Sequence, residues 1–162
     1  MSISAPTFDP ALKADGIRFA VCATRWNLEI VEQLLAGARS ALEKRGAREV
    51  QVYRCPGAFE LAPLAARVAR AGQVDGIIAL ACLIRGGTDH YTLLASETTR
   101  ALGMLAMEGG TNPRALAVSF GVLACDTLEQ AQERADPRRL DKGGEAALSC
   151  LAQVHALRAV PD

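Results

Sequence analysis

Short apolar runs alternate along this chain with segments in which apolar residues recur every three or four positions. Residues 17–23 are apolar at almost every position and predict a strand, and the segment after them has helical period and predicts a helix. We expect the side chain of Asn27 to cap this helix and Gly46 to end it. This first stretch therefore predicts one β-strand followed by one α-helix.

The same order of elements returns three times. Further strands are predicted over 49–53, 76–83 and 115–123. Helices follow them over 57–71, from the third loop to about Glu108, from Thr127, and finally over 142–158. Thr127 and Gln130 have the spacing of a capping box, in which each side chain binds the backbone N–H of the other residue.

Strands that are apolar throughout must be covered on both faces, which is typical of a parallel sheet between two layers of helices. The pattern predicts one α/β domain, a doubly wound three-layer sandwich of the flavodoxin-like class with strand order 2-1-3-4. We expect residues 16–160 to form it, after an N-terminal extension over 1–15. Ligands of such sheets bind beyond the carboxyl ends of the strands, so we expect the chemistry in those loops.

The charge balance excludes one class of partner. Eighteen Lys and Arg against eighteen Asp and Glu leave no net charge, whereas a nucleic-acid backbone needs a basic surface, so we expect no nucleic acid. The longest apolar run, 77–84, is far shorter than the roughly 20 residues that cross a bilayer, so we expect no membrane. Residues 1–15 lack the pattern of a secretory signal, which predicts a cytoplasmic chain.

The five cysteines form no C-x-x-C pair, and apolar residues flank most of them. This predicts buried, reduced thiols rather than disulfides. Several of them lie near strand ends, but their spacing does not match a known set of metal ligands. We therefore predict no metal site.

The loop after the third strand carries the strongest candidate chemistry. Gly86 and Gly87 let backbone N–H groups turn toward a ligand, and Thr88 adds a hydroxyl just before a helix N-terminus. This arrangement favours an anion such as phosphate. Histidine is the residue type best suited to exchange protons at physiological pH, so His90 could carry protons beside it. The pattern fits equally well a glycine-rich turn with a surface histidine.

Two other loops offer groups for a planar or polyol ligand. Trp26 at a strand end suits stacking on a heterocycle, although it could instead pack over the end of the sheet. Glu60 could accept hydrogen bonds from a polyol or complement a helix dipole. Taken alone, Arg134 is interpreted as a solvated charge and His155 as a surface residue.

Five motifs follow one another in the order found in one known family. They are Arg25-Trp26-Asn27, residues 56–61, residues 84–91, residues 120–123 with 126–131 and Arg134-Ala135, and Lys142-Gly143 with residues 145–147. Together they resemble the 6,7-dimethyl-8-ribityllumazine synthase family. The resemblance implies a transferase of riboflavin biosynthesis that condenses 5-amino-6-(D-ribitylamino)uracil with 3,4-dihydroxy-2-butanone 4-phosphate. Phosphate and water leave as the lumazine ring closes, and neither a metal nor a redox cofactor is implied.

The resemblance also implies a role for each matching residue. Trp26 would stack on the uracil, Asn27 and Glu60 would hold ribityl hydroxyls, and His90 would shuttle protons. The pocket would be completed by Gly57, Ala58, Phe59, Leu83 and Ile84. The phosphate would be bound by Gly86, Gly87, Thr88 and Arg134. A neighbouring subunit would contribute Phe120, Arg134, Lys142 and Glu145.

Sites that are shared between subunits imply a homopentamer as the smallest active unit. The interval from Arg134 to Lys142 is short, as in relatives that build a sixty-subunit icosahedral shell, which favours the shell, with riboflavin synthase as a candidate partner. The chain departs from the family's pattern at Gly87, where a residue with a side chain is common, at Asp141, where Asn is usual, and at Thr92-Leu93, where Asp-Tyr is frequent. None of these departures removes a residue assigned to chemistry. Residues 136–140 also differ from the Gly- and Lys-containing stretch that is usual in the shell-forming relatives.

Two alternatives remain open. A non-catalytic flavin- or lumazine-binding module would use the same pocket but has no need of both His90 and Arg134. A sugar-phosphate isomerase would use the Gly-Gly-Thr loop without requiring Trp26 and Phe59.

Overall fold

The computed structural model describes residues 7–108 and 116–161. Its elements are, in chain order, β1 (Phe19–Thr24), α1 (Leu28–Lys44), β2 (Val50–Cys55), α2 (Ala58–Ala71), β3 (Gly76–Ile84), α3 (His90–Glu108), β4 (Ala117–Cys125), α4 (Leu128–Ala135) and α5 (Lys142–Arg158). Within the described ranges, no helix combines the length and the apolar character needed to cross a membrane.

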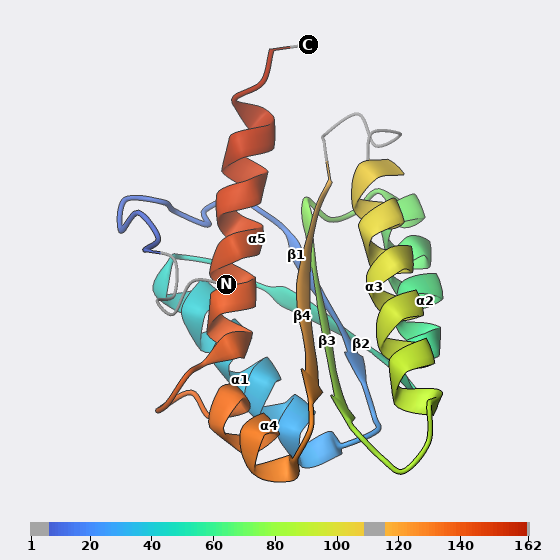
Figure 1. Ribbon diagram of the computed structural model, residues 1–162. Coiled ribbons are helices and arrows are strands. Elements are labelled where there is room, and N and C mark those ends of the chain that lie inside the picture. Colours follow the sequence, from blue (N-terminus) through green and yellow to red (C-terminus); the bar gives the residue numbers. More distant parts are fainter. Residues whose placement is uncertain (1–6, 109–115, 162) are drawn as a thin grey trace.

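The strands form one sheet in the order β2-β1-β3-β4, and every neighbouring pair is parallel. Helices α1, α4 and α5 lie on one face of the sheet and α2 and α3 on the other (Figure 1). The predicted three-layer fold and its strand order are confirmed. Because all strands run the same way, their carboxyl ends meet at one edge, at the bottom of Figure 1.

Side chains that alternate along the central strands fill two separate cores. In β1, Phe19 and Val21 pack with residues of α1 and α5, whereas Ala20 and Cys22 pack under α2 and α3. The first seven residues of β3 are buried on both faces. This burial explains the continuous apolar run that predicted the strand.

Several element boundaries differ from the predicted ones. β2 and β4 each end two residues later than expected, so Cys55 and Cys125 lie within strands. The predicted start of β4 at residue 115 lies outside the described residues. His90 is the first residue of α3 rather than the last residue of the loop. The loop that was predicted to carry the chemistry is therefore one residue shorter, and the helix N-terminus lies closer to its glycines.

Two helix caps differ from their predicted form. Asn27 stands at the N-cap of α1 with a φ of 54°, but its side chain does not cap the helix, and Nδ2 donates to the Cys82 carbonyl at 2.9 Å instead. At α4, the Thr127 hydroxyl accepts from the Gln130 N–H at 3.3 Å, as predicted. Gln130 Oε1, however, accepts from the Asp126 N–H at 3.0 Å rather than from Thr127. The Asn27 side chain therefore ties the start of α1 to β3, and the Gln130 side chain ties α4 to the loop before it.

Helices α1 and α5 approach each other closely where α5 begins. A Cβ at Gly143 would lie 2.0 Å from the Leu34 carbonyl oxygen, so only glycine fits there. Asp141 stands at the N-cap of α5 with a φ of 42°, and its Oδ1 accepts from the Gly144 N–H at 3.0 Å. Asp and Asn both tolerate this left-handed conformation and both cap helices. The departure from the family's pattern at Asp141 thus preserves the local structure.

A buried carboxylate stabilises the edge of the sheet at which the strands begin, opposite their carboxyl ends. Asp75 is 2% exposed, and its Oδ2 accepts from the Arg18 backbone N–H at 2.9 Å and from Arg18 Nε at 3.2 Å. Arg158 Nη2 lies 3.2 Å from Oδ1 as an ion pair without hydrogen-bond geometry. Burial alone would raise the pKa of this carboxyl, but the Arg18 hydrogen bonds and the two positive charges together lower it.

Replacing Asp75 with asparagine should destabilise the fold by about 1–3 kcal/mol at neutral pH, because the buried acceptor of Arg18 loses its charge and the ion pair with Arg158 is lost. The stability that the lowered pKa supplies is present above the unfolded-state pKa of about 3.9 and is lost as pH falls through the folded-state value. Urea denaturation at a series of acidic pH values should show a steeper loss of stability in the wild type than in Asp75→Asn. Parallel acid profiles would contradict this role.

Candidate active site

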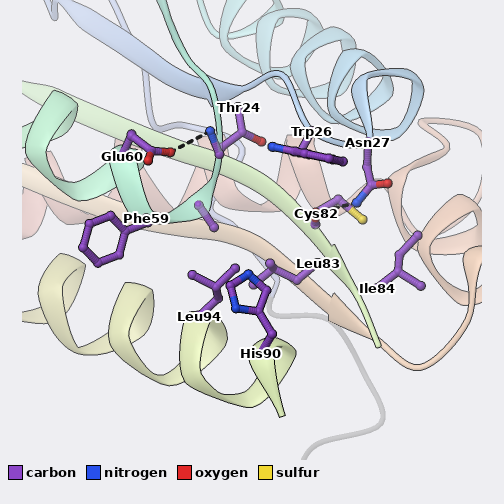
Figure 2. A pocket seen from close by; sticks show the side chains of 12 residues that line it. Thr24, Trp26, Asn27, Phe59, Glu60, Cys82, Leu83, Ile84, His90 and Leu94 are labelled. Carbon is purple, nitrogen blue, oxygen red and sulfur yellow. Dashed lines mark hydrogen bonds between the residues drawn. The ribbon is translucent and has the colours of Figure 1, made fainter. Parts of the chain in front are cut away.

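A cavity of about 530 Å³ opens at the carboxyl ends of β1 and β3, between the first turns of α2 and α3. Figure 2 shows the side chains that line it. Nine predicted site residues are among them: Trp26, Asn27, Gly57, Ala58, Phe59, Glu60, Leu83, Ile84 and His90. Residues that follow β1, β2 and β3 therefore line one cavity, as expected at the carboxyl ends of parallel strands.

Trp26 forms one wall of the cavity. Its side chain is 73% exposed, which disagrees with the interpretation that it packs over the end of the sheet. Its backbone N–H donates to the Pro56 carbonyl at 3.1 Å and fixes the β1–α1 loop against the β2–α2 loop. A Cβ at Gly57 would lie 3.1 Å from Trp26 Cδ1, so the glycine gives the indole room. The open face of the ring remains available for stacking.

The first turn of α2 supplies an aromatic ring and a carboxylate. Phe59 is 64% exposed beside the cavity. Glu60 Oε2 accepts from the Gly57 N–H at 3.0 Å and closes the first turn of the helix. Its Oε1 has no hydrogen bond to any residue in the described part of the chain. One carboxylate oxygen of Glu60 thus stabilises the start of α2, while the other is open to a ligand.

His90 and Leu94 reach the cavity from α3. Figure 2 shows the imidazole of His90 extending from the start of this helix, across the cavity from Trp26 and Glu60. Further along α3, the buried Thr98 donates from its hydroxyl to the Ala58 carbonyl at 3.2 Å. This bond joins α3 to the first turn of α2, so the two walls of the cavity are held together.

The glycine loop lies beside the cavity rather than in its wall. Gly86, Gly87 and Thr88 are exposed, and a Cβ at either glycine would meet no described atom within 4 Å. The loop leads directly into α3, whose N-terminus carries a partial positive charge. Its position suits an anion next to His90. Local crowding does not require a glycine at position 87, so the departure at Gly87 has no packing cause here.

The remaining predicted residues lie elsewhere on the same chain. Phe120, Lys142 and Glu145 line a smaller hollow of about 150 Å³ between β4 and α5. In this hollow Lys142 Nζ and Glu145 Oε2 are 2.5 Å apart. Arg134 lies on α4, where Nη1 donates to the Gln130 carbonyl at 3.1 Å. A single chain therefore does not bring these four residues into the main cavity.

Three residues of the cavity were not predicted, namely Thr24, Cys82 and Leu94. Thr24 is 1% exposed, and its hydroxyl has no hydrogen-bond partner among the described residues. Thr24 has the strand parity of Cys22, which faces α2 and α3, and this parity was a usable signal. Leu94 lies one helical turn after His90, so a helix beginning at His90 would also have indicated it.

The cysteines are all buried and free, which confirms the predicted buried, reduced thiols. Burial, with a smaller effect of Cys125, raises the pKa of Cys82 to about 12, so this thiol in the cavity wall stays protonated. Across the described ranges, no group of three or more His, Cys, Asp and Glu residues could hold a metal ion. His155 is half-buried rather than fully exposed, and its Nε2 lies 2.8 Å from the Lys13 carbonyl.

Known proteins are similar in sequence to this chain over most of its length. The family model for 6,7-dimethyl-8-ribityllumazine synthase matches residues 16–158, which include both the cavity and the smaller hollow. The relative of that name from Anaeromyxobacter sp. (strain Fw109-5) is 42% identical and covers 93% of this chain and 91% of its own. Those from Kineococcus radiotolerans and Chlorobium phaeobacteroides are 46% and 41% identical over 93% and 91% of this chain, and over 92% and 94% of their own lengths. The chain thus belongs to the 6,7-dimethyl-8-ribityllumazine synthase family.

Proposed function

We propose that this chain condenses 5-amino-6-(D-ribitylamino)uracil with 3,4-dihydroxy-2-butanone 4-phosphate to give 6,7-dimethyl-8-ribityllumazine, phosphate and water. The observation that carries the proposal is the cavity, which is lined by Trp26 from the β1–α1 loop, Glu60 from the first turn of α2 and His90 from the start of α3. Its volume of about 530 Å³ lies within the range of small-molecule sites, roughly 300–1,000 Å³. Family membership supplies the reaction, and the cavity supplies groups suited to it.

The uracil substrate would bind through its flat ring. The exposed face of Trp26 offers a stacking surface, and Phe59, Leu83 and Ile84 add apolar contacts. The ribityl chain would extend toward Glu60, whose Oε1 can accept from its hydroxyls. Because Asn27 Nδ2 already donates to Cys82, Asn27 would act on a hydroxyl through its Oδ1 as an acceptor.

The butanone phosphate would bind with its phosphate against the N–H groups of Gly86 and Gly87 and the Thr88 hydroxyl. The uracil 5-amine then adds to the ketone, and water leaves to give an imine. Loss of a proton next to the imine and of phosphate leaves an enol, which tautomerises to a carbonyl. The ribitylamino nitrogen attacks this carbonyl, and a second water leaves as the ring closes. These steps move protons without changing the overall oxidation state. His90, at the cavity wall beside the loop, would transfer them, a role typically worth about 10²–10⁴-fold in rate.

We further infer that each site is completed by a neighbouring subunit in a homopentamer. The predicted residues that do not reach the main cavity of their own chain support this inference. Phe120, Lys142 and Glu145 line the smaller hollow, and Arg134 lies on α4. A neighbour could present these groups to the cavity, so an isolated subunit would be inactive. Assembly into an icosahedral shell, a cytoplasmic location and riboflavin synthase as a partner are the further parts of this proposal.

The test supplies both substrates and follows lumazine formation by absorbance and fluorescence, with control reactions that omit one substrate each. We expect product only when both are present. A non-catalytic binding module would bind the product but form none of it. A sugar-phosphate isomerase would convert the phosphate substrate without the uracil. Either result would reject the proposed reaction.

A further inference from the structure

A cluster of polar residues lies at the base of the glycine loop, outside both the cavity and the smaller hollow. Arg85 precedes the loop and Tyr91 follows it, and the guanidinium carbon of Arg85 lies 4.4 Å from the centroid of the Tyr91 ring. Arg85 Nε also donates to Asp126 Oδ1 at 2.7 Å, and its backbone N–H donates to the Cys125 carbonyl at 2.9 Å. One residue thus connects both ends of the loop with the end of β4.

The partner of Arg85 is itself held in place. The Asp126 N–H donates to Gln130 Oε1 at 3.0 Å, at the start of α4. The carbonyl of Gln130 in turn accepts from Arg134 Nη1 at 3.1 Å. The Arg85–Asp126 pair therefore rests on the helix that carries Arg134, and is more than a contact between two freely moving surface side chains.

The loop between these anchors has few restraints of its own. Its glycines, Gly86 and Gly87, have open space around them, and residues 86–89 are exposed. Glycines sample many backbone conformations, so fixing them around a ligand costs conformational entropy. A contact that restricts the loop before the ligand arrives reduces that cost and improves affinity.

We propose that Arg85 is a positioning residue that holds the phosphate-binding loop in its binding conformation through Asp126 and Tyr91. The inference rests on the proposed function in taking phosphate as the ligand of this loop. Arg85 acts through the loop backbone, because its guanidinium is already engaged by Asp126 and lies over Tyr91. The Arg85 and Asp126 side chains are 51% and 64% exposed, so the pair contributes little to global stability. The pair instead increases the affinity of the loop for phosphate.

The test compares the assembled wild type with Arg85→Ala, Asp126→Asn and the double variant. Inorganic phosphate is the probe in calorimetric titrations, and steady-state kinetics give KM and kcat for the phosphate substrate. We expect each single variant to weaken phosphate binding and raise this KM about five- to tenfold, with kcat little changed, and the double variant to be no worse than either single one. Melting temperatures should match the wild type. Arg100→Ala removes another exposed arginine, which pairs with Glu97 within α3, and should bind phosphate normally.

Several results would overturn the inference. If Arg85→Ala weakens phosphate binding and Asp126→Asn does not, the pairing with Asp126 does not hold the loop, and the proposed role of the pair is wrong. Additive losses in the double variant, an equal loss in Arg100→Ala, or no phosphate binding by the wild type would also contradict a positioning role. Phosphate titration needs no turnover, so it separates the two proposals. A wild type that forms no lumazine but binds phosphate in the expected variant-dependent way would reject the proposed function and retain this inference.

Discussion

An Arg134→Ala variant is expected to lose about 10²–10³-fold in kcat/KM for lumazine formation, which is the usual cost of removing one preorganised donor to a developing anion. Arg134 is half-buried on α4, and the one hydrogen bond that the structure gives its side chain runs from Nη1 to the Gln130 carbonyl. Among the described residues its other guanidinium N–H groups have no hydrogen-bond partner, and in the proposed site they would donate charge-assisted hydrogen bonds to a phosphate dianion. Fold and assembly should be unaffected, because this single bond lies within one helix.

Steady-state kinetics with the phosphate substrate as the varied component measures this loss. Arg138→Ala is the matched control, since Arg138 lies on the following turn, is 91% exposed and pairs with Asp136. We expect the control to retain near wild-type activity. Full activity in Arg134→Ala would remove its phosphate role, and equal losses in both variants would point to a general effect of positive charge.

A Gly143→Ala variant should lose at least about 1–3 kcal/mol of stability, the usual cost of overpacking a tight interior. The added Cβ would lie 2.0 Å from the Leu34 carbonyl oxygen and 2.6 Å from its carbonyl carbon. These are backbone atoms of α1, which cannot turn aside as a side chain can. The helices would have to separate, and Lys142 and Glu145 would shift with α5, so we also expect reduced activity.

Urea denaturation compares this variant with Gly103→Ala. Gly103 also lies inside a helix, but a Cβ there would meet no described atom within 4 Å. Alanine is favoured over glycine in a helix interior by up to about 1 kcal/mol, so the control should be neutral or more stable. If both substitutions change stability equally, close packing of α1 on α5 does not explain the glycine.

The fold could be predicted from the sequence because each buried strand carries its own signal. β3 is apolar at every position from Ile77 to Ile84, and in the structure its first seven residues are buried on both faces. Such a run is typical of a strand that lies between two layers of helices. The strand order followed from the same pattern and the known preferences of doubly wound sheets. Strand ends were less accurate because Cys55 and Cys125 fit a strand or a loop equally well.

The helix caps show what local sequence cannot reveal. Asn27 has the residue type of an N-cap, but its amide reaches Cys82, 55 positions away in the chain. The side chain of Gln130 similarly accepts from the Asp126 N–H instead of the Thr127 N–H. In both cases the fold brings another hydrogen-bonding group within reach of the side chain. This group competes with the backbone of the helix start for the side chain, and it forms the hydrogen bond instead.

The candidate site was predicted only in part, again because local sequence does not reveal which groups the fold brings together. Trp26, Glu60 and His90 were found because each differs in chemistry from the apolar strand end beside it, and the structure gathers them in one cavity. Thr24 and Leu94 were missed because their residue types are ordinary for a strand and a helix. The smaller hollow with Phe120 was assigned through resemblance alone, since nothing in a single sequence indicates which groups a neighbouring subunit contributes.

Subunit complementation tests the central claim most directly, namely that each active site combines the cavity of one chain with groups of its neighbour. One chain carries Trp26→Ala and His90→Ala in the cavity, the other carries Arg134→Ala, and the two are co-expressed in equal amounts with different tags. Random assembly should leave about a quarter of the sites with both halves intact, so the mixed assembly should regain up to about a quarter of wild-type lumazine formation. A mixed assembly no more active than its two parents would show that the site lies within one chain, and would contradict the account.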